Sequence, residues 1–160
     1  MPISIISGGE TASGMTLALV VSRYHEFVTE RLADGALAAF EAAGGSRDNV
    51  LMIRVPGAFE VPFAARQVAQ ARSVDAVVCL GCLIRGATPH FDVIAAAVAH
   101  GITEASGATG VPMAFGVLTT NSAEEALERA QPGPSNKGWE AARAAIEMAS
   151  ISAQIGRAHV

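Results

Sequence analysis

Short apolar runs alternate with longer segments of helical periodicity along this chain. The runs are rich in β-branched residues and lack polar alternation, which is typical of strands buried on both faces of a parallel sheet. Asn121 with Glu124 resembles a capping box, which would start a helix that runs through Ala130. Strands are predicted at residues 17–21, 50–53, 76–80 and 111–118, and further helices at residues 26–43, 61–71, 91–106 and from residue 136 onward.

This alternation of strand and helix predicts an α/β fold: a three-layer α/β/α sandwich around a four-stranded parallel sheet, flavodoxin-like, with right-handed crossovers. A chain of 160 residues suits a single domain with one sizeable core, which we assign to residues 17–160. Residues 1–16 form an N-terminal arm, and residues 3–6 are its apolar segment. This segment is either a frayed tail or a strand added to a neighbouring subunit's sheet.

The stretch from residue 81 to residue 92 gathers most of the polar chemistry. It follows the third predicted strand, precedes a helix, and contains two glycines, Arg85, Thr88 and His90. Backbone N–H groups at a helix start are unpaired and favour an anion. Histidine exchanges protons near neutral pH and suits acid–base catalysis, but a lone histidine here also fits a structural role at the helix start.

Other aromatic and polar residues also follow strands. Ligands of open α/β sheets bind in the crevice outside the carboxyl ends of the strands. The aromatic rings would either stack on a flat ligand or close the core, and we interpret Glu60 as a helix cap rather than a substrate acceptor. The segments predicted to share the crevice are Tyr24, Phe59-Glu60, Thr88 to His90 and residues 115–120.

Two cations flank a Pro-Gly-Pro turn further along the chain. Of the eleven Lys and Arg residues, ten are arginine and Lys137 is the single lysine. Lys137 lies at a helix start, where a cation opposes the helix dipole, so a negative ligand would explain it. Arg129, near the end of the preceding helix, is explained more simply as a dipole partner, although the two together could hold a phosphate.

Cys79 and Cys82 form a C-x-x-C pair. Residues three apart on a strand point to opposite faces, and no second cysteine pair completes a zinc site. A thioredoxin-like pair would need a helix starting at the first cysteine. Both cysteines are therefore predicted to be structural, without redox or metal chemistry.

Composition narrows the classes of function. A net charge of −4 without a basic cluster argues against nucleic acid as the main ligand. No apolar run approaches the length of a membrane span and no signal peptide is visible, so we expect a cytoplasmic protein without membrane contact. Apolar residues make up 51% of the chain and charged residues 16%, which predicts surface hidden against other subunits.

Four motifs, taken in order, closely resemble the lumazine synthase family of riboflavin biosynthesis. They are VPGAFE at 55–60, GCLIRGATPH at 81–90, FGVLTT at 115–120, and Glu128-Arg129 with Asn136-Lys137-Gly138, within a resemblance over about residues 17–149. The family condenses 5-amino-6-(D-ribitylamino)uracil with 3,4-dihydroxy-2-butanone 4-phosphate to 6,7-dimethyl-8-ribityllumazine. It releases phosphate and water and needs neither a metal nor an organic cofactor.

The resemblance implies roles for the motif residues. His90 would transfer protons, and Ala87 and Thr88 would bind phosphate at the helix start. His25 departs from the family pattern at the ribityl contact, because many members carry asparagine at this position. The pyrimidine and ribityl chain would be held by Tyr24, Ala58, Phe59, Glu60, Cys82, Leu83 and Ile84. The adjacent subunit of a pentamer would supply Phe115, Arg129 and Lys137, with Arg129 on the phosphate.

Two alternatives from other classes remain on this scaffold: a non-catalytic flavin or lumazine binder, and a shell-forming protein. His90, Arg129 and Lys137 weaken the binder hypothesis, because an unphosphorylated ligand needs none of them. The shell hypothesis is compatible with catalysis, since some family members are catalytic capsids of sixty subunits. Riboflavin synthase is a further expected partner.

Overall fold

Four parallel strands form one sheet in the order β2-β1-β3-β4 in the computed structural model, which describes residues 2–157. Met1 of the predicted arm and residues 158–160 of the predicted domain lie outside the described residues. The strands are β1 (Leu17–Ser22), β2 (Val50–Val55), β3 (Ala76–Ile84) and β4 (Met113–Thr120). The predicted four-stranded parallel sheet is confirmed.

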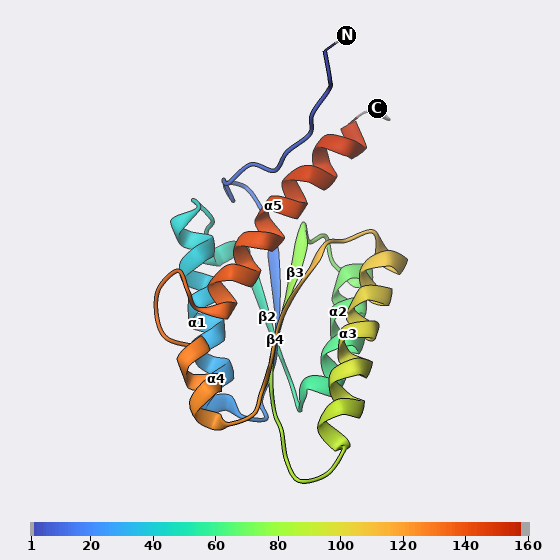
Figure 1. Ribbon diagram of the computed structural model, residues 1–160. Coiled ribbons are helices and arrows are strands. Elements are labelled where there is room, and N and C mark those ends of the chain that lie inside the picture. The colour runs from blue at the N-terminus through green and yellow to red at the C-terminus, as the bar shows by residue number, and fades with distance from the viewer. Residues whose placement is uncertain (1, 158–160) are drawn as a thin grey trace.

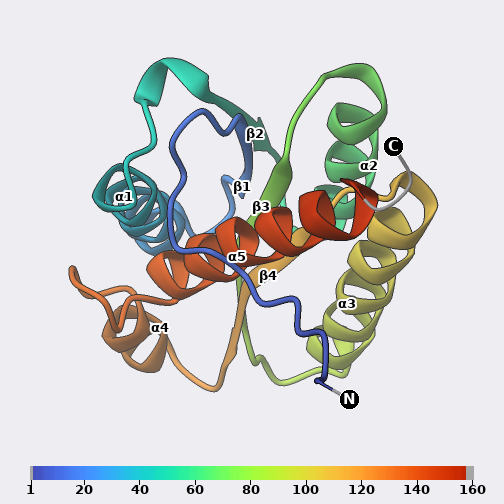
Figure 2. The ribbon, with the colours of Figure 1, turned by 90° about the horizontal axis from the view of Figure 1, so that it is seen from above.

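Helices cover both faces of this sheet (Figure 1). One core cluster joins the sheet to α1 (Glu26–Ala42), α4 (Ala123–Arg129) and α5 (Lys137–Arg157). The other joins it to α2 (Val61–Ala71) and α3 (His90–Thr109). The three-layer prediction is confirmed, and Figure 2 shows the sheet between the two helical layers. Two short 3-10 helices, Arg47–Asn49 and Ala58–Glu60, precede β2 and α2.

The third strand is longer than its apolar run predicts. It runs to Ile84, because β4 continues beside it and pairs Gly81 with Val117 and Ile84 with Thr120. A side chain at Gly81 would crowd Ser22 Oγ, which lies 3.2 Å from the Cβ position. The glycine that suggested a loop therefore marks close packing inside a strand.

The cap of α4 also differs from its prediction by one residue. Ser122, rather than Asn121, is the N-cap, and its Oγ accepts from the backbone N–H of Glu125 at 3.2 Å. The Glu125 carboxylate accepts from the N–H of Asn121 at 3.0 Å. Both S-x-x-E and N-x-x-E fit the cap pattern, so the sequence alone did not separate the two registers.

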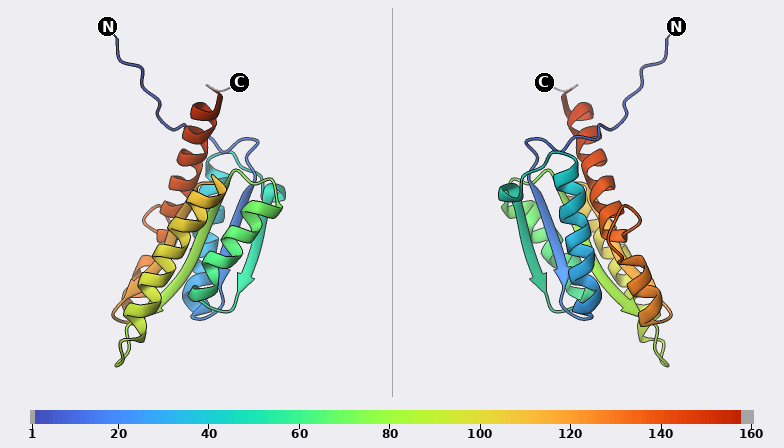
Figure 3. Two further views of the ribbon diagram at one scale, coloured as in Figure 1. Left: turned by 90° about the vertical axis from the view of Figure 1, so that its right-hand side faces the viewer. Right: turned by 90° about the vertical axis from the view of Figure 1, so that its left-hand side faces the viewer.

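The arm makes no strand with the rest of the described chain. Gly9 N–H donates to Ser150 Oγ at 2.9 Å, and Gln154 Nε2 donates to Ser7 O at 2.8 Å, which fixes the base of the arm on α5. Beyond that base the arm projects away from the sheet (Figure 3), and Ile3 is 84% exposed. No helix within residues 2–157 has the length and apolar character needed to cross a membrane.

The two cysteines lie in β3 and face opposite layers. Cys79 packs in the α2/α3 cluster and Cys82 in the α1/α5 cluster, so the predicted alternation is confirmed. Both are free thiols. Burial raises the pKa of Cys79 to about 12 and that of Cys82 to about 11. Because the thiolate is the nucleophile, neither residue is suited to redox chemistry at neutral pH.

The buried thiols give a direct test. At pH 7 the folded protein should react with an aromatic disulfide reagent at a small fraction of the rate of the urea-unfolded protein, because both thiols are protonated and inaccessible. The variant Cys79→Ala/Cys82→Ser should keep wild-type activity before and after oxidant treatment. Rapid labelling of the native protein would contradict the structural role.

Candidate active site

A pocket of about 460 Å³ lies at the carboxyl end of the sheet, where the chain leaves β1, β2 and β3. It brings together most of the residues predicted from the sequence. Its lining consists of Tyr24, His25, Gly57, Ala58, Phe59, Glu60, Leu83, Ile84, Gly86, Thr88, His90, Phe91 and Ile94. Ligands bind at this place in open α/β sheets.

Backbone hydrogen bonds hold two of the contributing segments side by side. Arg23 N–H donates to Val55 O at 2.8 Å, and Tyr24 N–H donates to Pro56 O at 3.1 Å. These bonds continue the pairing of β1 with β2 beyond the strand ends. The Tyr24 ring is thereby placed beside the segment that carries Phe59 and Glu60.

Arg85 holds the ends of the third segment of the pocket, the loop between β3 and α3, in place. Its N–H donates to Thr120 O at 2.8 Å, and its guanidinium lies 3.2 Å from Asp92 Oδ1 and 4.5 Å from the centre of the Phe91 ring. These contacts link the end of β3 to the first turn of α3, so the intervening loop has fixed ends. His90 is the first residue of α3, and no side chain caps this helix. The uncapped first turn, next to Gly86 and Thr88, suits an anion.

The exposure of the aromatic side chains favours a role in ligand binding over a role in closing the core. Tyr24 is 68% exposed and Phe59 is 58% exposed, so the hypothesis that these rings close the core is wrong. The rings are free to stack on a flat molecule, which is a favourable use of exposed aromatic surface.

Glu60 is not a side-chain cap. It occupies the N-cap position of α2 without making a side-chain hydrogen bond there, which corrects the sequence interpretation. The residue lines the pocket instead. Its carboxylate is therefore available as an acceptor for a donor-rich ligand.

Cys82 and Ala87 were predicted from the stretch at residues 81–92, but they do not line this pocket. The Cys82 side chain is buried in the core cluster under α1 and α5, so only its backbone could meet a ligand. Ala87 is exposed in the loop between Gly86 and Thr88, both of which do line the pocket.

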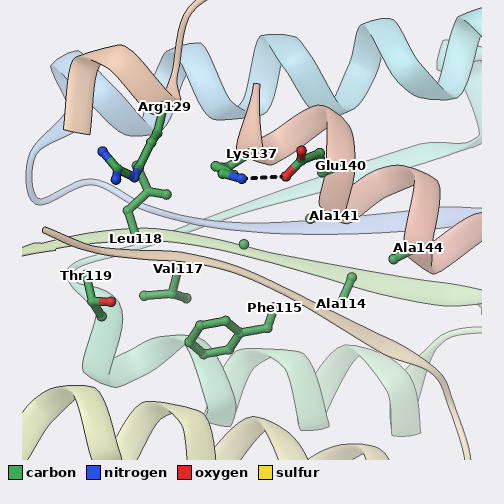
Figure 4. Close-up of a pocket in the computed structure, with 11 residues that line it drawn as sticks. Ala114, Phe115, Val117, Leu118, Thr119, Arg129, Lys137, Glu140, Ala141 and Ala144 are labelled. Atoms are coloured by element: carbon green, nitrogen blue, oxygen red, sulfur yellow. Dashed lines mark hydrogen bonds and ion pairs between the residues drawn. The ribbon is translucent and has the colours of Figure 1, made fainter. Parts of the chain in front are cut away.

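A second pocket, of about 340 Å³, holds the remaining predicted residues. It lies along β4 and the helices α4 and α5, and Phe115, Arg129 and Lys137 are part of its lining (Figure 4). Within the described residues, none lines both pockets. None of residues 115–120 lines the first pocket, so the prediction that they share a crevice with Tyr24 and His90 is wrong within one chain. The reason is that β4 runs to Thr120, which leaves Phe115 in the body of the strand.

The two cations of this second pocket have structural contacts of their own. Lys137 Nζ lies 2.9 Å from Glu140 Oε2, so a carboxylate one turn later offsets the cation at the helix start, and a negative ligand is not needed to explain it. Arg129 Nη1 donates to Glu125 O at 3.0 Å, in line with a role at the helix end. Both side chains nevertheless face the same cavity.

His25 also lines the first pocket, although the predicted site does not include it. Its ring lies 4.4 Å from the Tyr24 ring and 5.9 Å from the Phe27 ring. The signal in the sequence is its place directly after Tyr24 at the end of a strand.

No group of three or more His, Cys, Asp or Glu side chains within residues 2–157 is arranged to hold a metal ion.

His25 combines a strained backbone with a perturbed side chain. It adopts φ 62° and ψ 44°, a left-handed conformation that favours glycine or asparagine. Burial lowers its pKa below the ordinary value of 6.5. The unfolded chain then binds the proton more strongly than the folded one, so this contribution to stability is full above pH 6.5 and is lost as the pH falls below it.

The variant His25→Asn should therefore be at least as stable as wild type at pH 7.5, and it should lose less stability between pH 7.5 and pH 5.5. Urea unfolding at both pH values measures this difference. His100→Asn, which changes an exposed histidine on α3 outside the pocket, is the comparison variant. An unchanged pH dependence in His25→Asn would assign the effect to other groups.

Comparison with known proteins agrees with this geometry. The family model described as 6,7-dimethyl-8-ribityllumazine synthase matches residues 14–153. A protein of that name from Chlorobium phaeovibrioides is 51% identical over 94% of this chain and 97% of its own length. Another from Syntrophus aciditrophicus is 48% identical over 95% of this chain and 99% of its own length. The chain belongs to the 6,7-dimethyl-8-ribityllumazine synthase family.

Proposed function

We propose that this chain catalyses the condensation of 5-amino-6-(D-ribitylamino)uracil with 3,4-dihydroxy-2-butanone 4-phosphate, the penultimate step of riboflavin biosynthesis. The observation that carries the proposal is the pocket in which His90, at the uncapped start of α3, faces exposed aromatic rings and a carboxylate. A flat donor-rich ring, an anion and a proton acceptor would each find a matching group there.

The pyrimidine and its ribityl chain would occupy the part of this pocket formed by the strand ends. Tyr24 and Phe59 would stack on the ring, and Glu60 would accept hydrogen bonds from it or from the ribityl chain. Cys82 would contribute its backbone, because its side chain is buried in the core. Apolar contacts would come from Ala58, Leu83 and Ile84.

The phosphate would lie between two chains. Ala87 and Thr88 would bind it at the start of α3, and His90 would exchange protons beside it. Phe115, Arg129 and Lys137 would come from the adjacent subunit, because in one chain they line a separate pocket. β4 ends the sheet with one unpaired edge, which leaves that pocket at a surface that another subunit can cover.

The chemistry requires proton movements but no nucleophile from the enzyme. The aromatic amine attacks the ketone, the imine tautomerises, phosphate leaves, and the ring closes with loss of water. His90 would carry protons between these steps. Holding the two substrates together is worth roughly 7–11 kcal/mol for well-oriented groups, so positioning by both subunits would supply much of the rate enhancement.

Membership of the family implies small-molecule substrates and an oligomer. We infer a cytoplasmic homopentamer, which could build further into a sixty-subunit capsid and associate with riboflavin synthase. The layer formed by α2 and α3 supports an oligomer, because it leaves apolar surface exposed. In α3 only Val98, Ile102 and Ala105 are buried, and Phe63 and Val93 are exposed apolar residues of this layer. Residues 3–6 would add a strand to the neighbouring subunit's sheet.

Mixing the purified protein with both substrates tests the proposed activity. The lumazine absorbance should grow with time, and one phosphate should be released for each product formed. Binding of lumazine or flavin without turnover would instead identify a non-catalytic protein on this scaffold.

The variant Arg129→Ala should weaken use of the butanone phosphate by roughly 10–100-fold, because a charge-assisted hydrogen bond is worth about 1.5–3 kcal/mol. The affinity for the pyrimidine should barely change. Steady-state kinetics with each substrate varied in turn measures both values. Equal damage to both substrates would indicate a helix or subunit contact instead of a phosphate ligand.

The variant His90→Ala should lower kcat by about 10²–10⁴-fold and leave KM for both substrates nearly intact. The loss should lie near the lower end, since proximity survives the substitution and buffer can carry protons. The same kinetic assay measures it. A change in KM alone would remove His90 from proton transfer.

Assembly should be required for activity, because the proposed site takes side chains from two chains. Sedimentation of the active enzyme should show a pentamer or a multiple of it, and dilution should reduce specific activity as subunits separate. Deleting residues 2–6 should weaken assembly without lowering the secondary-structure content. An active monomer would contradict both the pentamer and the shared site.

A further inference from the structure

Arg129 and Lys137 come from two helices whose connection has little support of its own. α4 spans only Ala123–Arg129, and the turn at residues 131–135 is largely exposed. So short a helix is marginal in isolation, and a turn in water does not fix the direction of the next element. Core packing holds the body of each helix, so the remaining question is which contact beside the turn sets the spacing of the two cations.

The side chain of Asn136 supplies that connection. It is buried, with 1% of its surface exposed. Its Nδ2 donates to Ala130 O at 3.0 Å and to Arg31 O at 3.2 Å. Its Oδ1 accepts from Gly138 N–H at 2.8 Å and from Trp139 N–H at 3.1 Å.

All the hydrogen-bonding capacity of the amide is thus used, since asparagine has two donors and one oxygen with two lone pairs. One side chain joins the residue after Arg129, the body of α1 and the first turn of α5. Burial removes competing water, so these bonds hold their partners more firmly than exposed ones would.

Two glycines show how closely α1 packs against residues 136–138. A Cβ at Gly35 of α1 would overlap the Asn136 amide, and a Cβ at Gly138 would overlap Leu32 O. Successive helical residues are rotated by about 100°. With Gly138 held against α1, Lys137 projects to a different side and reaches the cavity beside Glu140 (Figure 4).

We propose that Asn136 is a positioning residue of the phosphate site, which fixes the spacing and direction of Arg129 and Lys137 without touching the substrate. This inference rests on the proposed function, in which these two cations receive the phosphate. Asparagine is required because the task needs a helix cap and two N–H donors in one side chain. Serine caps a helix about as well but cannot reach both carbonyls.

The variant Asn136→Ser therefore keeps the cap of α5 and removes the link to α1 and α4. Inorganic phosphate, used as an inhibitor that competes with the butanone phosphate, is the probe. We expect its inhibition constant and KM for the butanone phosphate to rise about tenfold, as when one charge-assisted hydrogen bond is misplaced. KM for the pyrimidine and kcat at saturation should stay within about twofold.

Thr29→Val is the matched control for a general loss of stability. It removes another buried hydrogen bond of α1, from Thr29 Oγ1 to Ser22 O at 2.7 Å, away from the pocket of Arg129 and Lys137. It should lower Tm and leave inhibition by phosphate unchanged. Gly35→Ala, which keeps Asn136 but displaces its amide, is the second variant. It should weaken inhibition by inorganic phosphate in the same way, and it tests the proposal if Asn136→Ser does not fold.

The proposal is overturned if folded Asn136→Ser or Gly35→Ala has a lower Tm but unchanged inhibition by phosphate. It is also overturned if KM rises equally for both substrates, which would indicate general distortion. If Arg129→Ala leaves inhibition by phosphate unchanged as well, the phosphate assignment itself is wrong. That result separates a failure of the proposed function from a failure of the role given to Asn136.

Discussion

Burial of β3 on both faces is the constraint on which the rest of this structure depends. The strand pairs with β1 on one side and β4 on the other, and its side chains alternate between the two core clusters. A strand without a solvent face requires helices on both sides of the sheet, and parallel pairing requires each crossover to return the chain to the same edge. The chain therefore leaves every strand at one end of the sheet, where the polar residues gather.

The same constraint divides the functional residues into two groups. The segments that follow β1, β2 and β3 meet in one pocket with His90. β4 is an edge strand, and its pocket opens along the free edge beside α4 and α5. Because Phe115 lies in the body of β4, the chain cannot bring it to its own pocket with His90 without breaking the pairing of β3 with β4. A second subunit at the free edge resolves this, in the proposed assembly, and would cover apolar surface that one chain leaves in water.

The features that the sequence predicted correctly depend on local pattern. Residues 61–71 form α2 at the predicted bounds, because apolar periodicity and an early proline define a helix locally. The features it missed depend on contacts between distant residues. Gly81 belongs to a strand because β4 continues beside it, and Glu60 faces the pocket because no backbone group at the start of α2 receives its side chain.

The candidate site divides in the same way. Tyr24, Phe59 and His90 could be predicted from their places after strands, because the topology rule sends such residues to one crevice. The separate pocket of Phe115 and Lys137 could not be predicted from strand ends, since it depends on how far β4 continues beside β3. Asn136 carries no chemical signal of its own, because its importance lies in four hydrogen bonds to residues from three helical segments.

In the proposed assembly, a site shared between two subunits would link catalysis to assembly. Neither pocket alone would hold the phosphate beside both His90 and the two cations, so the effective molarity of the bound substrates would exist only at the completed interface. That interface would have to be rigid, because a displacement of about 1 Å costs a large part of that advantage. α5 answers this requirement: it packs along α1, begins at a buried asparagine, and carries Lys137 on its first turn. Because α5 is packed in the core, Lys137 is held in a fixed position at the edge of the molecule, where the neighbouring subunit would use it.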